Sequence, residues 1–102
     1  TYIEDILQGI EGARRLLESS SDPRFEIINL GENRTVTLIE MIKTLSEEMG
    51  AYPKIDHLPL QPGDVRQTFA DITKAQELLG YDPRWDFRDG VRMFLNWFES
   101  IN

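Results

Sequence analysis

The stretch FEIINLGENRTVTLIEMIKTLSEEMG, residues 25–50, decides the fold class of this chain. Its first six residues, Phe25–Leu30, form an apolar run without clean alternation, which is typical of a strand covered on both faces. The following tetrad TLIE, residues 37–40, has the spacing of a helix-opening capping box. The helix that it opens has an apolar stripe, and Gly50 is a suitable residue to end it. A buried strand that leads directly into a helix predicts an α/β protein.

Helices and short extended segments are predicted on both sides of this stretch. Residues 3–17 carry apolar side chains at helical spacing. Gly9 and Gly12 interrupt that helix one turn apart, which indicates close packing against another element. The elements predicted downstream are an extended segment at 53–60, a brief one at 65–70, a short helix from Asp71 that Gly80 ends, and a last helix that Asp86 caps. The predicted order is α-β-α-β-α-α with few, short strands, in one globular unit of residues 1–102.

Composition excludes several classes of function. The net charge is −7, with 11 basic against 18 acidic residues, so the field of the chain repels nucleic acid. The chain has no cysteine, so disulfides and thiolate metal sites are excluded. The lone histidine, His57, is interpreted as a surface or strand residue, and no metal site is expected. No apolar run approaches the roughly 20 residues that span a membrane, so we expect a cytoplasmic protein without membrane contact.

A complete active site is absent from the sequence. There is no glycine-rich dinucleotide fingerprint after a strand, no P-loop and no Gly-x-Ser-x-Gly motif. The three tyrosines, Tyr2, Tyr52 and Tyr81, also lack a lysine four residues later, the pair that short-chain reductases use for proton transfer. No catalytic residue is therefore assigned to this chain.

The turn QPGDVR, residues 61–66, is the strongest candidate for a binding site. Its Pro-Gly pair rigidifies a turn that presents Asp64 and Arg66 two residues apart. A carboxylate can accept bonds from two vicinal hydroxyls, and a guanidinium can pair with phosphate oxygens, so the two would suit a nucleoside diphosphate. From spacing alone, a surface turn with a local Asp–Arg ion pair accounts for the motif more simply.

Three segments of the chain, in order, resemble a known family. These are TYIEDILQGIEGA at the start, INLGENRTVTLIEMI in the middle, and PGDVRQTFADITKAQELLGYDPRWDFRDGVRMFLNWF at the end. Together they resemble the C-terminal part of the extended short-chain dehydrogenase/reductases that act on nucleotide sugars, the NAD-dependent epimerase/dehydratase family. The motif QPGDV is most similar to the corresponding motif of the UDP-glucuronate 4-epimerases of capsular polysaccharide biosynthesis.

The resemblance implies a division of labour within a longer protein. An upstream Rossmann domain would bind NAD and carry the catalytic Tyr/Lys pair. Residues 1–102 would bind the UDP-sugar and would be inactive alone. The full enzyme would invert C4 of the sugar through a 4-keto intermediate. By position, Asp64 would contact the nucleotide ribose and Arg66 the diphosphate. Several relatives have an arginine where this chain has Gln61, so the phosphate role would rest on Arg66.

Two other functions remain open from the sequence. A dehydratase or decarboxylase of the same family would differ in residues upstream of this chain, and a non-enzymatic binding module could use the same fold. For a fragment of an α/β protein we expect exposed apolar surface and unpaired strand edges. We therefore predict a homo-oligomer or self-association of the fragment.

Overall fold

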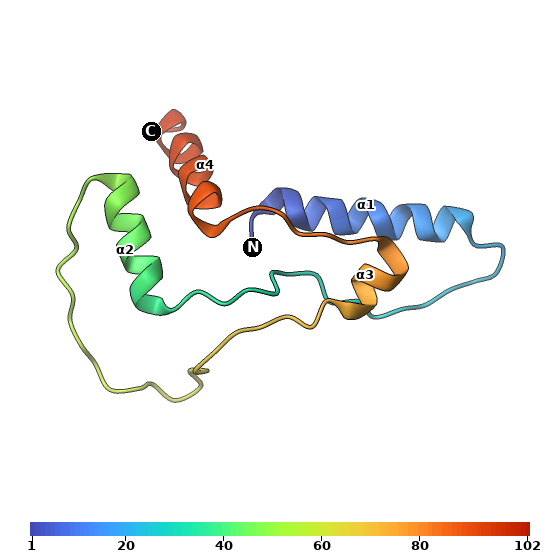
Figure 1. Ribbon diagram of the computed structural model, residues 1–102, viewed down its shortest axis with the longest axis horizontal. Coiled ribbons are helices and arrows are strands. Elements are labelled where there is room, and N and C mark those ends of the chain that lie inside the picture. Colours follow the sequence, from blue (N-terminus) through green and yellow to red (C-terminus); the bar gives the residue numbers. More distant parts are fainter.

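The computed structural model describes all residues 1–102 as four helices joined by long extended segments (Figure 1). The helices are α1 (Ile3–Ser19), α2 (Leu38–Met49), α3 (Thr73–Leu79) and α4 (Phe87–Ser100). α1 packs against α3 and α2 packs against α4, and no other two helices meet. The molecule is therefore two helix pairs, set side by side along its length.

The predicted strands are absent, which corrects the α/β assignment. Residues 25–30, 53–60 and 65–70 are extended, but none of them forms a ladder with another segment. Every backbone hydrogen bond of the chain belongs to a helix, a helix end or a turn. A strand exists only when a neighbouring strand satisfies its N–H and C=O groups, and these segments have no such neighbour.

The helix boundaries follow from local caps. At α2 the capping box is formed: Thr37 N donates to Glu40 Oε2 at 2.8 Å, and Glu40 N donates to Thr37 Oγ1 at 3.3 Å. Asp86 caps α4 as predicted, because its side chain accepts from the N–H of Arg88. Asp71 accepts from the Thr73 N–H at the start of α3, one residue before the N-cap position. Gly50 and Gly80 end α2 and α3 in the left-handed conformation.

The close packing predicted for the glycines of α1 is confirmed. A Cβ atom on Gly9 would lie 2.5 Å from the side chain of Leu30. A Cβ atom on Gly12 would lie 3.1 Å from the carbonyl oxygen of Leu79, at the end of α3. α1 thus lies close to both the extended segment 25–30 and α3, and the Leu79 backbone leaves little room for a side chain at Gly12.

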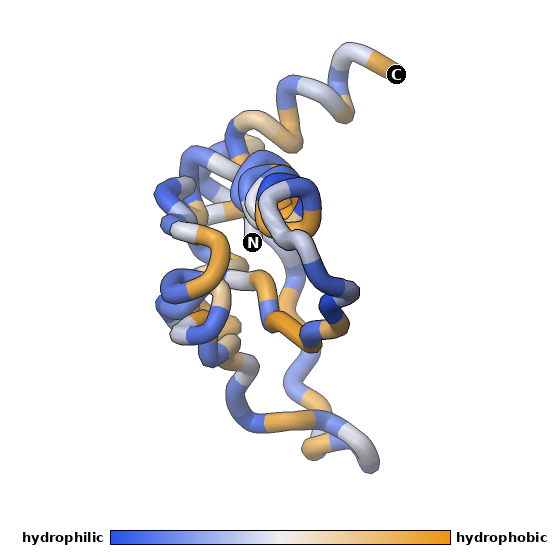
Figure 2. The backbone as a smooth tube through the Cα atoms, turned by 90° about the vertical axis from the view of Figure 1, so that its right-hand side faces the viewer, coloured by the Kyte–Doolittle hydropathy of each residue, from blue (hydrophilic) through white to orange (hydrophobic).

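The single globular core that length and composition predict does not form. Only 8 of 102 residues are buried, and the apolar core consists of Ile72, Ala75 and Tyr81. The radius of gyration is 17.4 Å, whereas a compact domain of about 100 residues has about 13 Å. Hydrophobic residues lie along the outlying extended segments as well as along the helices (Figure 2). The predicted exposure of apolar surface is confirmed, with Phe25, Ile27 and Leu58 as examples.

Candidate functional site

A broad groove lies where the start of α1, the first half of α4 and the extended segments 31–36 and 68–70 come together. It has a volume of about 1140 Å³, slightly more than the roughly 300–1000 Å³ of small-molecule sites. Its aromatic lining consists of Tyr2, Phe69, Trp85, Phe87, Phe94 and Trp97. Its polar lining consists of Thr1, Glu32, Arg34, Thr35, Thr68 and Asp86. A mostly apolar concavity with a few polar groups is the usual composition of a ligand site, so this groove is the candidate site.

Asp5 anchors the groove at the start of α1. This carboxylate is 2% exposed, and it accepts hydrogen bonds from the backbone N–H of Arg84 at 3.0 Å and of Trp85 at 3.1 Å. The ring of Trp85 in turn packs on Tyr2, with centroids 4.3 Å apart. A Cβ atom on Gly90 would lie 3.3 Å from Tyr2, so α4 also begins close to α1. Asp5 therefore fixes the approach of the chain into α4.

Tyr81 ties the loop after residue 30 to the core. Its side chain is buried, and its hydroxyl donates to the carbonyl oxygen of Gly31 at 3.1 Å. Burial raises the pKa of the Tyr81 hydroxyl above its ordinary value, and the negative charge of Asp5 adds to this effect. A Cβ atom on Gly31 would lie 2.9 Å from the Cβ of Ala70. The segments at 31–36 and 68–70, which both line the groove, are thus held together.

The predicted site residues Asp64 and Arg66 lie outside the groove lining. The turn has the expected geometry: Asp64 N donates to the Gln61 carbonyl at 3.1 Å, and Gly63 has a φ of 89°. The Asp64 carboxylate accepts from the Gln61 N–H at 3.1 Å. Both Asp64 and Arg66 are exposed, and no ion pair joins them. The chain enters the groove two residues later, at Thr68.

The lack of an Asp64–Arg66 ion pair bears on the two interpretations of the turn. The surface-turn interpretation expects that pair, and the structure does not form it. Arg66 has no hydrogen-bond or ion-pair partner in the chain, so its guanidinium is free for a ligand. The groove lining begins two residues after the turn, at Thr68, and the structure does not bring the two side chains together.

No group of three His, Cys, Asp or Glu side chains is placed to hold a metal ion, and His57 is exposed. None of the four helices combines the length and hydropathy that a membrane-spanning segment requires.

Sequence reasoning missed the residues that organise the groove. No long-range contact of Asp5 or of Tyr81 was predicted from the sequence. Trp85 is a packing residue, because its ring lies against Tyr2. Trp97 contacts Phe94 at a centroid distance of 5.7 Å, but it is 55% exposed and lines the groove.

A family model described as GDP-mannose 4,6 dehydratase matches residues 15–94 of this chain. The chain belongs to this family. The resemblance to nucleotide-sugar epimerases and dehydratases inferred from the sequence is confirmed.

Individual relatives of the family agree with this assignment. An uncharacterized protein of Methanocaldococcus jannaschii is 38% identical over 96% of this chain and 28% of its own length. UDP-glucuronate 4-epimerase 5 of Arabidopsis thaliana is 37% identical over 96% of this chain and 24% of its own length. The solved UDP-glucuronic acid 4-epimerase of Bacillus cereus, in complex with UDP-glucuronic acid and NAD, superimposes with a TM-score of 0.83 at 30% identity, over 100% of this chain and 32% of that one. The chain thus spans about a quarter to a third of these relatives.

Proposed function

We propose that this chain is the substrate-binding segment of an NAD-dependent nucleotide-sugar epimerase, which inverts C4 of a UDP-sugar through a 4-keto intermediate. The observation that carries the proposal is the whole-chain superposition on the Bacillus cereus enzyme, which was solved with UDP-glucuronic acid and NAD. Because this chain covers 32% of that enzyme and lacks a Tyr/Lys pair, we assign the catalytic groups to another part of a longer protein. The segment alone is then inactive.

Within the segment, the turn at 61–66 is assigned to the nucleotide. Asp64 would accept bonds from the two ribose hydroxyls, and Arg66 would pair with diphosphate oxygens in bidentate geometry. Two structural facts support this assignment: Arg66 has no partner in the chain, and the turn leads directly into the groove at Thr68. The sugar would then lie along the groove.

NAD does not fit the residues of this chain. A dinucleotide site needs glycines at the turn between a strand and a helix, where backbone N–H groups face the pyrophosphate. The only closely spaced glycines, Gly9 and Gly12, lie inside α1 and pack against Leu30 and Leu79. We therefore assign NAD to the remainder of the proposed enzyme.

A dehydratase is the second candidate, and one observation favours it. The matching family model is described as GDP-mannose 4,6 dehydratase, so a GDP-sugar is an alternative substrate. The same turn could hold either nucleotide, because ribose and diphosphate are common to both. The base distinguishes the two functions.

Amide NMR spectra recorded during titration with UDP, UDP-glucuronate, UDP-galactose and GDP test these assignments. We expect UDP and its sugars to shift the amides of residues 64–69, and GDP to shift them less. Larger shifts with GDP would favour the dehydratase. A spectrum of folded protein in which millimolar UDP shifts no amide signal would contradict the nucleotide-binding role of this segment.

Two charge-removing variants separate a specific contact from a general field effect. Arg66→Ala is expected to abolish the shifts. Lys54→Ala removes one positive charge from the neighbouring extended segment 53–60, where Lys54 also has no partner, and is expected to leave the shifts in place. If both variants lose the UDP-induced shifts equally, UDP binding depends only on the overall charge.

A further inference from the structure

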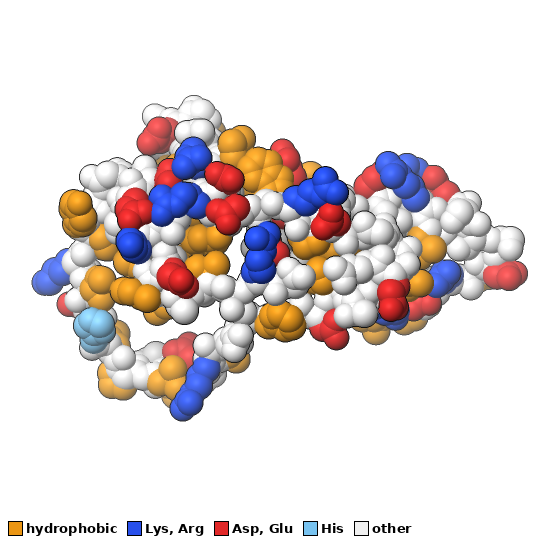
Figure 3. Space-filling model, viewed as in Figure 1, with side chains coloured by type: hydrophobic (Ala, Val, Ile, Leu, Met, Phe, Trp, Pro, Cys, Tyr) orange, Lys and Arg blue, Asp and Glu red, His pale blue; other side chains and the backbone are white.

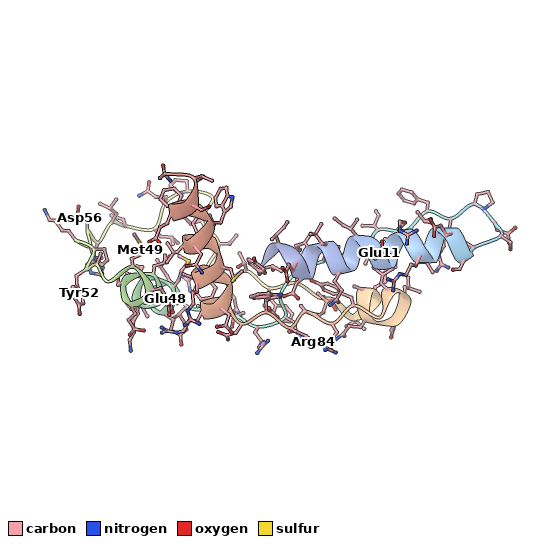
Figure 4. The ribbon with its side chains drawn as sticks, turned by 90° about the horizontal axis from the view of Figure 1, so that it is seen from above. Glu11, Glu48, Met49, Tyr52, Asp56 and Arg84 are labelled. Carbon is pink, nitrogen blue, oxygen red and sulfur yellow. The ribbon has the colours of Figure 1, made fainter.

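α2 is attached to α4 through a cluster of charged side chains. Arg88 of α4 donates to Glu48 of α2 at 2.7 Å and to Glu47. Arg92 of α4 donates through Nε to Glu48 Oε2 at 3.1 Å. Figure 3 shows basic and acidic side chains alternating where the two helices meet, and Glu48 lies on the side of α2 that faces α4 (Figure 4). These four residues are called the α2–α4 clamp below.

Apolar packing between α2 and α4 is weak by comparison. No side chain of α4 is buried, and the one buried residue of α2 is Thr44. Leu38 and Ile39 of α2 are 68% and 64% exposed, whereas Ile42 and Leu45 are half-buried. The segments that flank α2 form no ladder with the rest of the chain. The clamp therefore supplies every ion pair that joins α2 to another element.

The clamp is charged near neutral pH. Hydrogen bonds from Arg88 lower the pKa of Glu47, and those from Arg92 and Arg88 lower the pKa of Glu48. Glu48 is the central member, because both arginines contact it and its side chain is only 13% exposed. Exposed ion pairs are individually weak and are screened by salt, whereas a network that shares one partner holds a single geometry more firmly.

We propose that the α2–α4 clamp sets the width of the groove and opens when its charges are screened or removed. α2 contributes Met41 to the lining of the groove, and α4 contributes Val91 and Phe94. Loss of the clamp lets α2 move away on its two unpaired flanking segments. α1 and α3 stay in place, because Gly12 of α1 packs against Leu79 at the end of α3 and no ion pair joins these two helices.

Distances between paired spin labels test the clamp, and the absence of cysteine allows clean labelling. One pair is placed on α2 and α4, at Ile39→Cys and Asn96→Cys. A reference pair is placed on α1 and α3, at Glu4→Cys and Glu77→Cys. All four positions are exposed and lie outside the clamp. Between about 0.05 M and about 1 M salt the Debye length falls to about 3 Å, so the α2–α4 distance is expected to lengthen and broaden while the α1–α3 distance stays constant.

Charge variants give the decisive comparison at low salt. The double variant Arg88→Gln/Arg92→Gln is expected to show the long, broad α2–α4 distance already at low salt. Exchanging the charges of all four clamp residues is expected to restore the short distance. Arg14→Gln, which removes ion pairs within α1 alone, is the matched control and is expected to change neither distance.

An unchanged α2–α4 distance in the double variant, with helix content retained by circular dichroism, overturns the proposal. If the double variant does not fold, the salt titration of the labelled wild-type chain decides: a constant distance overturns the proposal, and a lengthening confined to α2–α4 supports it. No nucleotide is present in these measurements, so a failure of the proposed function leaves their outcome unaffected.

Discussion

Replacing Asp5 with alanine is expected to destabilise the chain more than any change at its other acidic residues. The substitution removes the only acceptor of the Arg84 and Trp85 backbone N–H groups. A buried donor without a partner costs roughly 1–3 kcal/mol. Both donors are partly buried, so we expect about 2–4 kcal/mol in total, against roughly 5–15 kcal/mol for the whole stability of a typical domain. Asp5→Asn keeps one acceptor oxygen, so we expect about half of that loss.

Urea unfolding followed by circular dichroism and tryptophan fluorescence measures this loss. Trp85 lies beside Asp5 and packs on Tyr2, so its emission should shift with Asp5→Ala. Glu4→Ala is the matched control, since Glu4 is exposed on the same turn of α1 and has no partner. We expect the control to stay within about 0.5 kcal/mol of wild type. If Asp5→Ala unfolds outright, an osmolyte that favours burial restores a measurable transition. An Asp5→Ala value equal to the Glu4→Ala value would refute the reasoning.

Four further predictions follow from the packing and the charges. Gly12→Ala is expected to cost about 1–3 kcal/mol in urea unfolding, because the new methyl group meets the Leu79 backbone, which cannot swing away. The hydrogen bond from Arg14 lowers the pKa of the Glu11 carboxyl to about 2. The stability that this pair contributes is therefore present above about pH 4.5 and is lost as the pH falls toward 2. NMR titration of the Glu11 carboxyl measures this pKa. Burial raises the pKa of the Tyr81 hydroxyl. The stability that this hydroxyl contributes is therefore present below about pH 10 and is lost as the pH rises through the pKa of the folded state. Ultraviolet titration should show one tyrosine that ionises at a higher pH than the ordinary tyrosine value. Sedimentation velocity at rising concentration should show self-association, because much apolar surface is exposed.

Each of these has a result that would contradict it. Equal stability of Gly12→Ala and wild type would mean that α1 and α3 can separate at no cost. A Glu11 titration midpoint near 4.5, or one unaffected by Arg14→Gln, would mean that the ion pair does not persist in solution. Three tyrosines that ionise together would place the Tyr81 hydroxyl in water. A single sedimenting species at all concentrations would rule out self-association.

The helices could be predicted from the sequence because their signals are local. Thr37 and Glu40 satisfy each other's backbone groups within one turn, and Gly50 and Gly80 end helices through their own backbone conformation. Neither effect depends on distant residues. The close packing of Gly12 was predictable for a similar reason, since glycine inside a helix has a cost that only close packing offsets.

The absence of paired strands could not be predicted from the sequence. Phe25–Leu30 has the composition of a buried strand, but pairing depends on a neighbouring strand, and residues 1–102 offer none. The long-range contacts of Asp5 and Tyr81 were also hidden, because their partners lie 79 and 50 residues away. The turn at 61–66 was predicted correctly in its backbone, whereas its position relative to the groove depends on the whole chain.

The order in which the helices find their partners has a consequence for biosynthesis. α1 and α2 are made first, yet their partners α3 and α4 begin only at Thr73 and Phe87. A ribosome adds roughly 5–20 residues per second, so both early helices emerge several seconds before either can pack. Isolated helices shorter than about 12–15 residues are marginal in water, which applies to α2 in particular. The α1–α3 and α2–α4 contacts therefore form only after the last third of these residues has been made.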